Sequence, residues 1–535
     1  MTPVTRDQIH RRRWSILAVV SLAVFVTVLD GTIVNVALPT LATTLDASTS
    51  QLQWIVDAYL LVFTGLLLAA GGLGDRYGRK RALVVGLVVF GATSAFAGMA
   101  GDADVLILGR ALMGVGAALI FPATLAILTN VFTDPGERAK AIGIWSAVSG
   151  VAVAAGPIVG GWLLEHFWWG SVFFVNVPIV VVALAATLRL VPESREVDAP
   201  ALDWRGLLLS VAAIGTLVLT IIEAPTWGWL SPPTVVGFAG AAVLLVGFVA
   251  WELRLEHPML PVRIFRNRRF TAASASITSA FFALFGFIFL ITQYFQLIRG
   301  YSPLEAGVRT LPVAISIAVA SVVAPRIVDG VGTTKVVATG LVLMAAGFVW
   351  VSTASASTPY LEIVGQMMLL GVGLGLTTAP ATESIMGSVS LDKAGVGSAV
   401  NDTTRELGGT LGVAIVGSVF SSVYANALAD GRVFGTLPPE AQGATEDSVG
   451  AAQVVATKLG DAAPAYLADV SNAFLSGLAV ACLVVAGVAL VGAFVAWRFL
   501  PARAEVLDTA DAVATDAVAA DELGNLGAPE PLYAE

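Results

Sequence analysis

The chain has 535 residues, of which 57% are hydrophobic and only 13% are charged. Soluble domains carry about 25% charged residues because their surfaces meet water, so this composition excludes a string of soluble domains and indicates a membrane protein. One cysteine, Cys482, and three histidines exclude a disulfide framework and leave too few ligands for a haem or zinc centre. The formal charge of -9 arises mostly after residue 501, so it identifies no partner. We expect no metal, no cofactor and no nucleic acid.

Fourteen apolar runs are long enough to cross a bilayer, which takes about 20 helical residues. The first run follows three arginines, as a signal peptide would, but it is too long and lacks a cleavage site. The predicted fold class is therefore an all-α integral membrane protein with fourteen spans. Their approximate limits are 14–39, 52–74, 82–100, 104–130, 141–164, 171–191, 205–223, 233–252, 270–296, 308–328, 335–355, 360–387, 396–424 and 471–499.

The basic residues orient these spans. Of the 29 lysines and arginines, 23 fall on the side of the two termini and four in the opposite loops. The positive-inside rule therefore predicts both termini in the cytoplasm and a location in the cell membrane. The expected segments are a cytoplasmic N-terminus (1–13), a six-helix bundle (14–200), two inserted spans (201–258), a second six-helix bundle (259–500) and an acidic, solvated cytoplasmic tail (501–535). Within the second bundle we expect a mobile external loop, 425–470, with one surface helix.

An internal repeat relates the two bundles, as in many transporters. The loop Asp75-Arg-Tyr-Gly78-Arg-Lys-Arg81 has the same order of acid, glycine and base as Asp329-Gly-Val-Gly332-Thr-Thr-Lys335. The separation is 254 residues. In the fourth and twelfth spans, Gly114-Val-Gly116 and Gly371-Val-Gly373 each precede a Pro-Ala-Thr sequence at nearly the same offset. Two matches in corresponding spans favour duplication.

Three charged residues lie at similar depth in the outer half of the membrane: Asp30, Asp57 and Arg110. A charge at the bilayer centre costs about 2.5–3.5 kcal/mol, so each one suggests a function. If they face one cavity, the arginine can hold the aspartates ionised and form a proton site. The alternative is a simple packing ion pair, which carries more weight for Asp57 because that residue lies near the membrane interface.

A second group of charges lies in the thirteenth span, where Asp402, Arg405 and Glu406 share one helical side. We interpret it as a second proton or cation site, with a self-neutralised cluster as the alternative. The chain lacks the glycine-rich Lys-Ser/Thr loop that cradles ATP phosphates. Transport driven by a proton gradient is therefore expected, since one proton crossing 100 mV supplies about 2.3 kcal/mol.

Four motifs carry a close resemblance to the major facilitator superfamily, in its fourteen-span drug:proton antiporter branch, over residues 14–500. They are Leu29-Asp-Gly-Thr-Ile-Val-Asn-Val-Ala-Leu-Pro39, Gly71-Gly-Leu-Gly-Asp75-Arg76-Tyr-Gly78-Arg79-Lys80-Arg81, Arg110-Ala-Leu-Met-Gly114 and Gly156-Pro157-Ile-Val-Gly160-Gly161. Two positions depart from the family pattern: Met113 replaces a common glutamine and Ala152 a glycine.

The resemblance implies two six-helix bundles that rock around a central site and export lipophilic, cationic compounds in exchange for protons. It assigns proton coupling to the intramembrane charges, a conformational switch to Gly71, Asp75, Arg76, Gly78, Arg79, Lys80, Asp329 and Gly332, and antiport to Gly156, Pro157, Gly160 and Gly161. Simple helix packing is the alternative for the glycines. Export of a single metabolite, such as an antibiotic or siderophore, and lipid flipping remain alternative functions. No catalytic constellation suggests an enzyme, and the substrate-binding residues and oligomeric state are not predicted.

Overall fold

The structure, a computed structural model, describes residues 6–196, 202–256, 258–389 and 394–501. The described chain contains 14 helical segments long and apolar enough to cross a membrane, which confirms the predicted spans. The helices are α1 (Arg6–Thr44), α2 (Thr49–Tyr77), α3 (Arg79–Gly98), α4 (Ala103–Val131), α5 (Pro135–His166), α6 (Ser171–Phe174), α7 (Asn176–Leu190), α8 (Trp204–Trp227), α9 (Pro232–Glu252), α10 (Arg268–Gln293), α11 (Pro303–Arg309), α12 (Leu311–Val331), α13 (Thr333–Val351), α14 (Tyr360–Met386), α15 (Ala394–Ala429), α16 (Pro439–Asp447), α17 (Val449–Ala456) and α18 (Ala463–Phe499).

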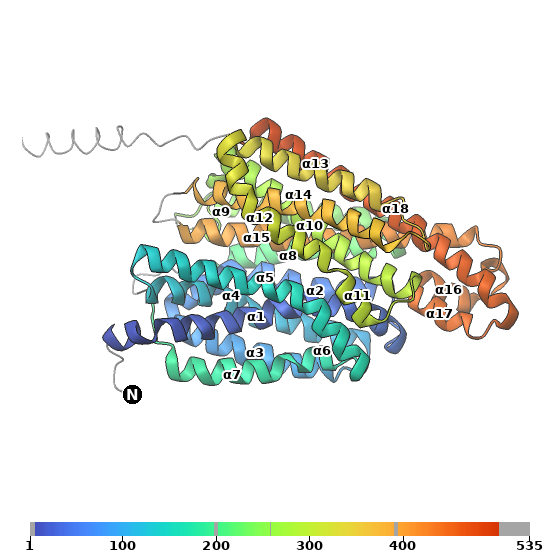
Figure 1. Cartoon of the computed structure of the whole chain (residues 1–535), viewed down its shortest axis with the longest axis horizontal. Coiled ribbons are helices and arrows are strands. Elements are labelled where there is room, and N and C mark those ends of the chain that lie inside the picture. Colours follow the sequence, from blue (N-terminus) through green and yellow to red (C-terminus); the bar gives the residue numbers. More distant parts are fainter. Residues whose placement is uncertain (1–5, 197–201, 257, 390–393, 502–535) are drawn as a thin grey trace, which may run out of the picture.

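The molecule consists of two layers of roughly parallel helices (Figure 1). Helices α1–α7 form the first half, α10–α18 form the second, and α8 and α9 are inserted between them along the chain. The short helices α16 and α17 project at one end of the molecule, which we call the cap end. The start of α1 and the turn between α2 and α3 lie at the opposite end, which we call the open end.

Local sequence signals explain where several helices begin. The hydroxyl of Ser48 accepts a hydrogen bond from Gln51 N, and Gln51 Oε1 accepts one from Ser48 N, so α2 begins with a capping box. Ser302 and Glu305 form the same box at α11, and Asp102 caps α4. Each pair satisfies amide groups that a helix leaves free at its start.

The predicted repeat recurs in the turns of the two halves. Gly78 separates α2 from α3 with φ of 119°, and Gly332 separates α12 from α13 with φ of 87°. Side-chain-bearing residues rarely adopt these angles, so each turn requires its glycine. The two turns join corresponding helices of the two halves, as the separation of 254 residues predicts.

The repeat extends to helix packing. A Cβ atom on Gly86 of α3 would lie 2.9 Å from the carbonyl oxygen of Gly116 in α4. In the second half, a Cβ atom on Gly340 of α13 would lie 2.6 Å from the carbonyl oxygen of Gly373 in α14. Paired glycines therefore let the backbones of corresponding helices touch, which is a common way to pack helices where lipid supplies no hydrophobic force.

The prediction of a mobile loop with one surface helix at residues 425–470 was wrong. Helix α15 continues to Ala429, α18 begins at Ala463, and two helices lie between them. Helix α17 buries an apolar side toward the protein, and the Tyr466 and Thr445 hydroxyls hydrogen-bond at 2.6 Å. The Ala-rich composition that suggested mobility instead permits close helix packing. We call α16 and α17 the cap. The tail after Pro501 and the first five residues lie outside the described residues.

Candidate functional site

A buried ion pair lies inside the first half. The guanidinium of Arg110 on α4 donates from Nη1 to Asp30 Oδ2 on α1, and both side chains are 0% exposed. The Asn176 amide of α7 donates to the other Asp30 oxygen at 2.9 Å. Arg110 Nε donates to the carbonyl oxygen of Ile55 at 2.9 Å, and the guanidinium stacks 4.4 Å above the ring of Tyr59. Four helices thus position this pair.

The energetics of such a pair make each partner depend on the other. Removing one member of a buried ion pair costs about 3–5 kcal/mol, because the remaining charge is left uncompensated. A change in the protonation of Asp30 would remove the negative charge that balances Arg110. The structure therefore brings together Asp30 and Arg110 as predicted, with geometry that suits both a packing pair and a proton site.

Asp57 forms no ion pair or hydrogen bond with Asp30 or Arg110 among the described residues. Its side chain is 0% exposed, and neither carboxylate oxygen has a hydrogen-bond partner in the described chain. Gln53, one turn earlier on the same side of α2, donates to the carbonyl oxygens of Val413 and Ala414 in α15. Asp57 therefore lies on the side of α2 that faces the second half.

The charged group on α15 contains no direct ion pair among the described residues. Arg405 donates to the Thr382 hydroxyl at 3.0 Å and lies 5.4 Å from the centre of the Phe281 ring. Within the described chain it forms no ion pair with Asp402 or Glu406, which stand one turn apart and are half-buried. The amide of Asn401 donates to one oxygen of Asp402 at 3.4 Å.

The predicted switch loop of the first half binds the segment that follows α7. Arg79 pairs with Asp75 at 2.8 Å, and the backbone amide of Arg79 donates to the carbonyl oxygen of Ser194. The backbone amide of Lys80 donates to Glu193 Oε1 at 3.1 Å. Arg76 is exposed, and Gly71 on α2 stands in ordinary contact with Pro122.

In the second half, only the turn of the switch loop is reproduced. Gly332 makes the bend, whereas Asp329 is exposed and has no ion-pair partner among the described residues. The ion pair between the acidic residue and the basic residue of the switch loop is therefore confined to the first half of the described structure. A sequence repeat predicts the backbone turn better than it predicts the side-chain contacts around it.

The glycines of the predicted antiport motif close the cap end. A Cβ atom on Gly156 would meet Thr32, and one on Gly160 would lie 2.8 Å from Ile33 Cγ1, so α5 packs tightly on α1. A Cβ atom on Gly161 would lie 2.6 Å from the Cα atom of Leu304 in α11. The carbonyl oxygen of Pro157 contacts Gly307 of the same short helix. The close contacts of these glycines therefore agree with the helix-packing interpretation. The contacts of Pro157 and Gly161 with α11 join the two halves.

Side-chain amides that the sequence analysis did not assign also join the halves at the cap end. Gln53 donates to Ala414 O at 2.9 Å, and Gln296 donates to Val36 O at 2.9 Å. The Thr49 hydroxyl donates to the carbonyl oxygen of Asp447 in the cap at 2.9 Å. Among the described residues, every hydrogen bond between the halves lies at this end. Polar amides inside otherwise apolar spans are the signal that could have identified these contacts.

A pocket lies between the halves next to this closed end. It is lined by Thr32 and Asn35 of α1, by Thr292 and Thr310, and by apolar residues of α5, α10 and α12, and its volume is about 50 Å³. Drug-sized ligands occupy pockets of about 300–1,000 Å³, so this one must widen to hold such a compound.

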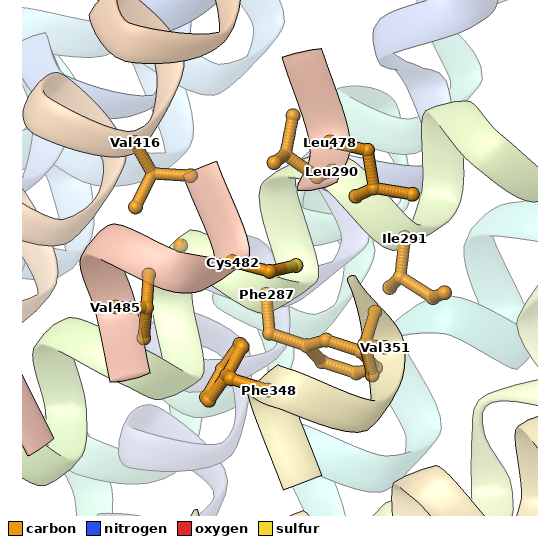
Figure 2. A pocket seen from close by; sticks show the side chains of 10 residues that line it. Phe287, Leu290, Ile291, Phe348, Val351, Val416, Leu478, Cys482 and Val485 are labelled. Atoms are coloured by element: carbon orange, nitrogen blue, oxygen red, sulfur yellow. The ribbon is translucent and has the colours of Figure 1, made fainter. Parts of the chain in front are cut away.

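A second, wholly apolar pocket lies inside the second half, between Phe287, Phe348 and Cys482 (Figure 2). Its volume of about 10 Å³ is smaller than a water molecule needs, so it is a packing void.

Two helical halves of fourteen predicted spans, a buried charge pair and a pocket between the halves are typical of a membrane carrier. Residues 20–413 match the Major Facilitator Superfamily, and the chain belongs to this family. The chain is 38% identical over 487 residues to the multidrug efflux pump LfrA of Mycolicibacterium smegmatis, covering 90% of this chain and 96% of that protein. It is 36% identical over 417 residues to the methyl viologen resistance protein SmvA of Salmonella typhimurium, covering 77% and 83%.

The fold is also that of a solved transporter. A bacterial homologue of the human lysosomal transporter Spinster, in an inward-facing and unoccupied conformation, superposes with a TM-score of 0.67 at 17% identity. The match covers 92% of this chain and 99% of the other. The family assigns the chain to multi-pass membrane transport rather than to enzyme catalysis.

Proposed function

We propose that this protein exports lipophilic, cationic compounds across the cell membrane in exchange for protons. The observation that carries the proposal is the fully buried Asp30–Arg110 pair, an ionisable couple in a membrane interior where charges are expensive. The names of LfrA and SmvA, an efflux pump and a resistance protein for the dication methyl viologen, support export and a cationic substrate class.

In this proposal the cap end faces outward and both termini face the cytoplasm. The excess of lysine and arginine in the loops at the open end supports that orientation. The halves touch at the cap end, and no hydrogen bond joins them at the open end among the described residues. This arrangement then corresponds to a state that accepts substrate from inside. Transport requires a second state, in which the cap end separates and the open end closes.

The proposed coupling begins at Asp30. A proton arriving from outside neutralises Asp30 and frees Arg110, which favours release of a cationic compound. Loss of that proton to the cytoplasm restores the ion pair and a negative site for the next cycle. Asp57, Asp402 and Glu406 are proposed to supply further exchangeable protons, since each carboxyl group lies in a helix that adjoins the boundary between the halves. Membrane potential adds about 2.3 kcal/mol per 100 mV for each charge moved.

The experiment that tests this proposal measures protons directly. Purified protein in weakly buffered detergent solution should release protons when tetraphenylphosphonium is added, and the Asp30→Asn variant should release fewer. Everted vesicles should accumulate the same cation only when a proton gradient is imposed. Accumulation that persists after the gradient is collapsed would overturn the antiport proposal, and export restricted to one neutral metabolite or lipid would favour the alternative functions.

A further inference from the structure

The two halves meet along two lateral seams, and one is covered by the inserted helices. The covered seam lies between α2 and α15. The carboxylate of Glu223 on α8 accepts hydrogen bonds from the Ser50 hydroxyl at 2.9 Å and the Trp54 indole at 3.1 Å, both on α2. The Ser418 hydroxyl on α15 donates to the carbonyl oxygen of Ile221 on α8 at 2.7 Å. Helix α8 therefore binds both walls of this seam, and it lies behind α5 in the view of Figure 1.

Apolar packing seals the same seam. Val218, Ile221 and Ile222 of α8 form a buried cluster with Ala414 of α15, and Trp54 and Leu61 of α2 pack against it. Deeper along α2, a Cβ atom on Gly65 would lie 2.8 Å from Val211 Cγ2, so the backbones of α2 and α8 stay close over several turns. A compound dissolved in the bilayer cannot pass here without displacing α8.

The opposite seam, between α5 and α12, has no such cover. At the cap end α11 joins the two helices through Gly161 and Gly307. Toward the open end, a Cβ atom on Gly143 or Gly150 of α5 would meet nothing within 4 Å, and Ala318 of α12 is exposed. Within the described structure, α12 has α5, α11, α13 and α14 as its main helix neighbours, and none of them spans this seam as α8 spans the other.

The pocket between the halves borders this uncovered seam, since α5 and α12 both contribute to its walls. These walls include Val153 and Pro157 of α5 and Ala314 and Ile317 of α12, while Thr32 and Asn35 of α1 form a polar side. The lining from α5 and α12 is mostly apolar and suits the body of a lipophilic ion, and the polar groups of α1 suit its charge. Residues 153 and 157 of α5 continue the side that carries the uncovered Gly143 and Gly150, since all recur at helical spacing.

We propose that lipophilic compounds enter the pocket sideways from the bilayer through the α5–α12 seam, and that the inserted helices α8 and α9 close the α2–α15 seam to them. This inference rests on the proposed function, which it deepens by naming the route of the substrate. A lipophilic cation concentrates in the membrane by the transfer of its apolar surface, so a lateral entrance meets it at higher concentration than an aqueous one does. Because one of the two seams is covered, only the other can serve as a lateral entrance.

The test compares two cations of different lipid solubility in everted vesicles. Tetraphenylphosphonium dissolves in the bilayer, whereas methyl viologen stays in water. Ala318→Trp places a bulky ring in the uncovered seam at a residue that does not line the pocket, and Val319→Trp, the next exposed residue of the same helix, is the matched control. We expect Ala318→Trp to slow tetraphenylphosphonium uptake at least about fivefold and to change methyl viologen uptake less than about twofold, and we expect Val319→Trp to change neither. Equal loss for both cations, or for neither, overturns the lateral route.

A measurement that needs no transport separates this inference from the proposed function. A bilayer-dissolved aryl diazirine is photolysed in proteoliposomes, with glutathione in the water to quench any aqueous probe. Thr32 and Asn35 are 6% and 2% exposed, and we expect the probe to label them in the native protein and not in Ala318→Trp. No label at these residues, or label that persists in Ala318→Trp, overturns the lateral route. Labelling as expected in a protein that moves neither cation would defeat the proposed function and leave the opening itself established.

Discussion

Gly307 of α11 lies against the carbonyl oxygen of Pro157 in α5, with no room between them for a side chain. This contact joins the two halves at the cap end, so it exists only while that end is closed. Gly307→Ala should push the halves apart, since overpacking costs about 1–3 kcal/mol, enough to shift a conformational equilibrium several-fold. The control is Gly143→Ala, whose added methyl group meets nothing within 4 Å.

The readout for this pair of variants is labelling from the cap side. In a Cys482→Ala background, Asn35→Cys places one thiol in the pocket, where an impermeant maleimide can reach it only when the cap end opens. We expect faster labelling in Gly307→Ala than in Gly143→Ala. Equal rates would show that the α5–α11 contact does not limit opening.

The Asp30–Arg110 pair predicts a stability change together with a functional one. Asp30→Asn leaves the Arg110 charge buried without its partner, and we expect a loss of about 3–5 kcal/mol in stability and of proton-driven efflux. The double variant Asp30→Asn, Arg110→Gln removes both charges and should recover thermal stability without recovering efflux. The measurements are the melting temperature of the purified protein and dye uptake by everted vesicles. A double variant that transports normally would remove the pair from the coupling mechanism.

Substitution of Asp57 should affect stability in the opposite direction from substitution of Asp30. The reason is that the buried oxygens of Asp57 have no hydrogen-bond partner among the described residues. A buried carboxylate without hydrogen bonds destabilises the state that holds it, so Asp57→Asn should fold at least as stably as the native chain. We expect its efflux to fall at least about tenfold, since the amide cannot exchange a proton. Asp75→Asn, at the switch loop, serves as a second carboxylate variant outside the bundle interior. Full efflux by Asp57→Asn would exclude a coupling role.

The paired glycines predict equivalent variants in the two halves. Gly116→Ala would place Cβ 2.7 Å from Phe90 N, and Gly373→Ala would place it 2.8 Å from Met344 N. Each should lower stability by about 1–3 kcal/mol, measured as a fall in melting temperature, whereas Gly487→Ala meets nothing within 4 Å and should not. A large effect in one half alone would mean that the two helix pairs do not pack equivalently.

The sequence predicted the spans well because span length and apolar composition are set by the bilayer rather than by tertiary contacts. The Asp30–Arg110 pair was predictable because few ionisable groups lie inside the helices. The neighbours of Asp57 could not be predicted, because depth along a helix does not specify which side a residue faces. The roles of Asn176 and Gln53 were not predicted, because an uncharged amide inside a span is not as unusual as a charged group. The two helices of the cap were not predicted because they are short and Ala-rich.

The cap belongs to the second half by its chain connections, yet Gly450 packs against Ala42 of α1 and Asp447 accepts a hydrogen bond from Thr49 of α2. In the proposed orientation, these contacts must break each time the outer end opens. The junction between the cap and the first half is then an epitope that exists only in one state of the cycle. An antibody fragment raised against it would arrest the carrier from outside the cell without having to cross the membrane.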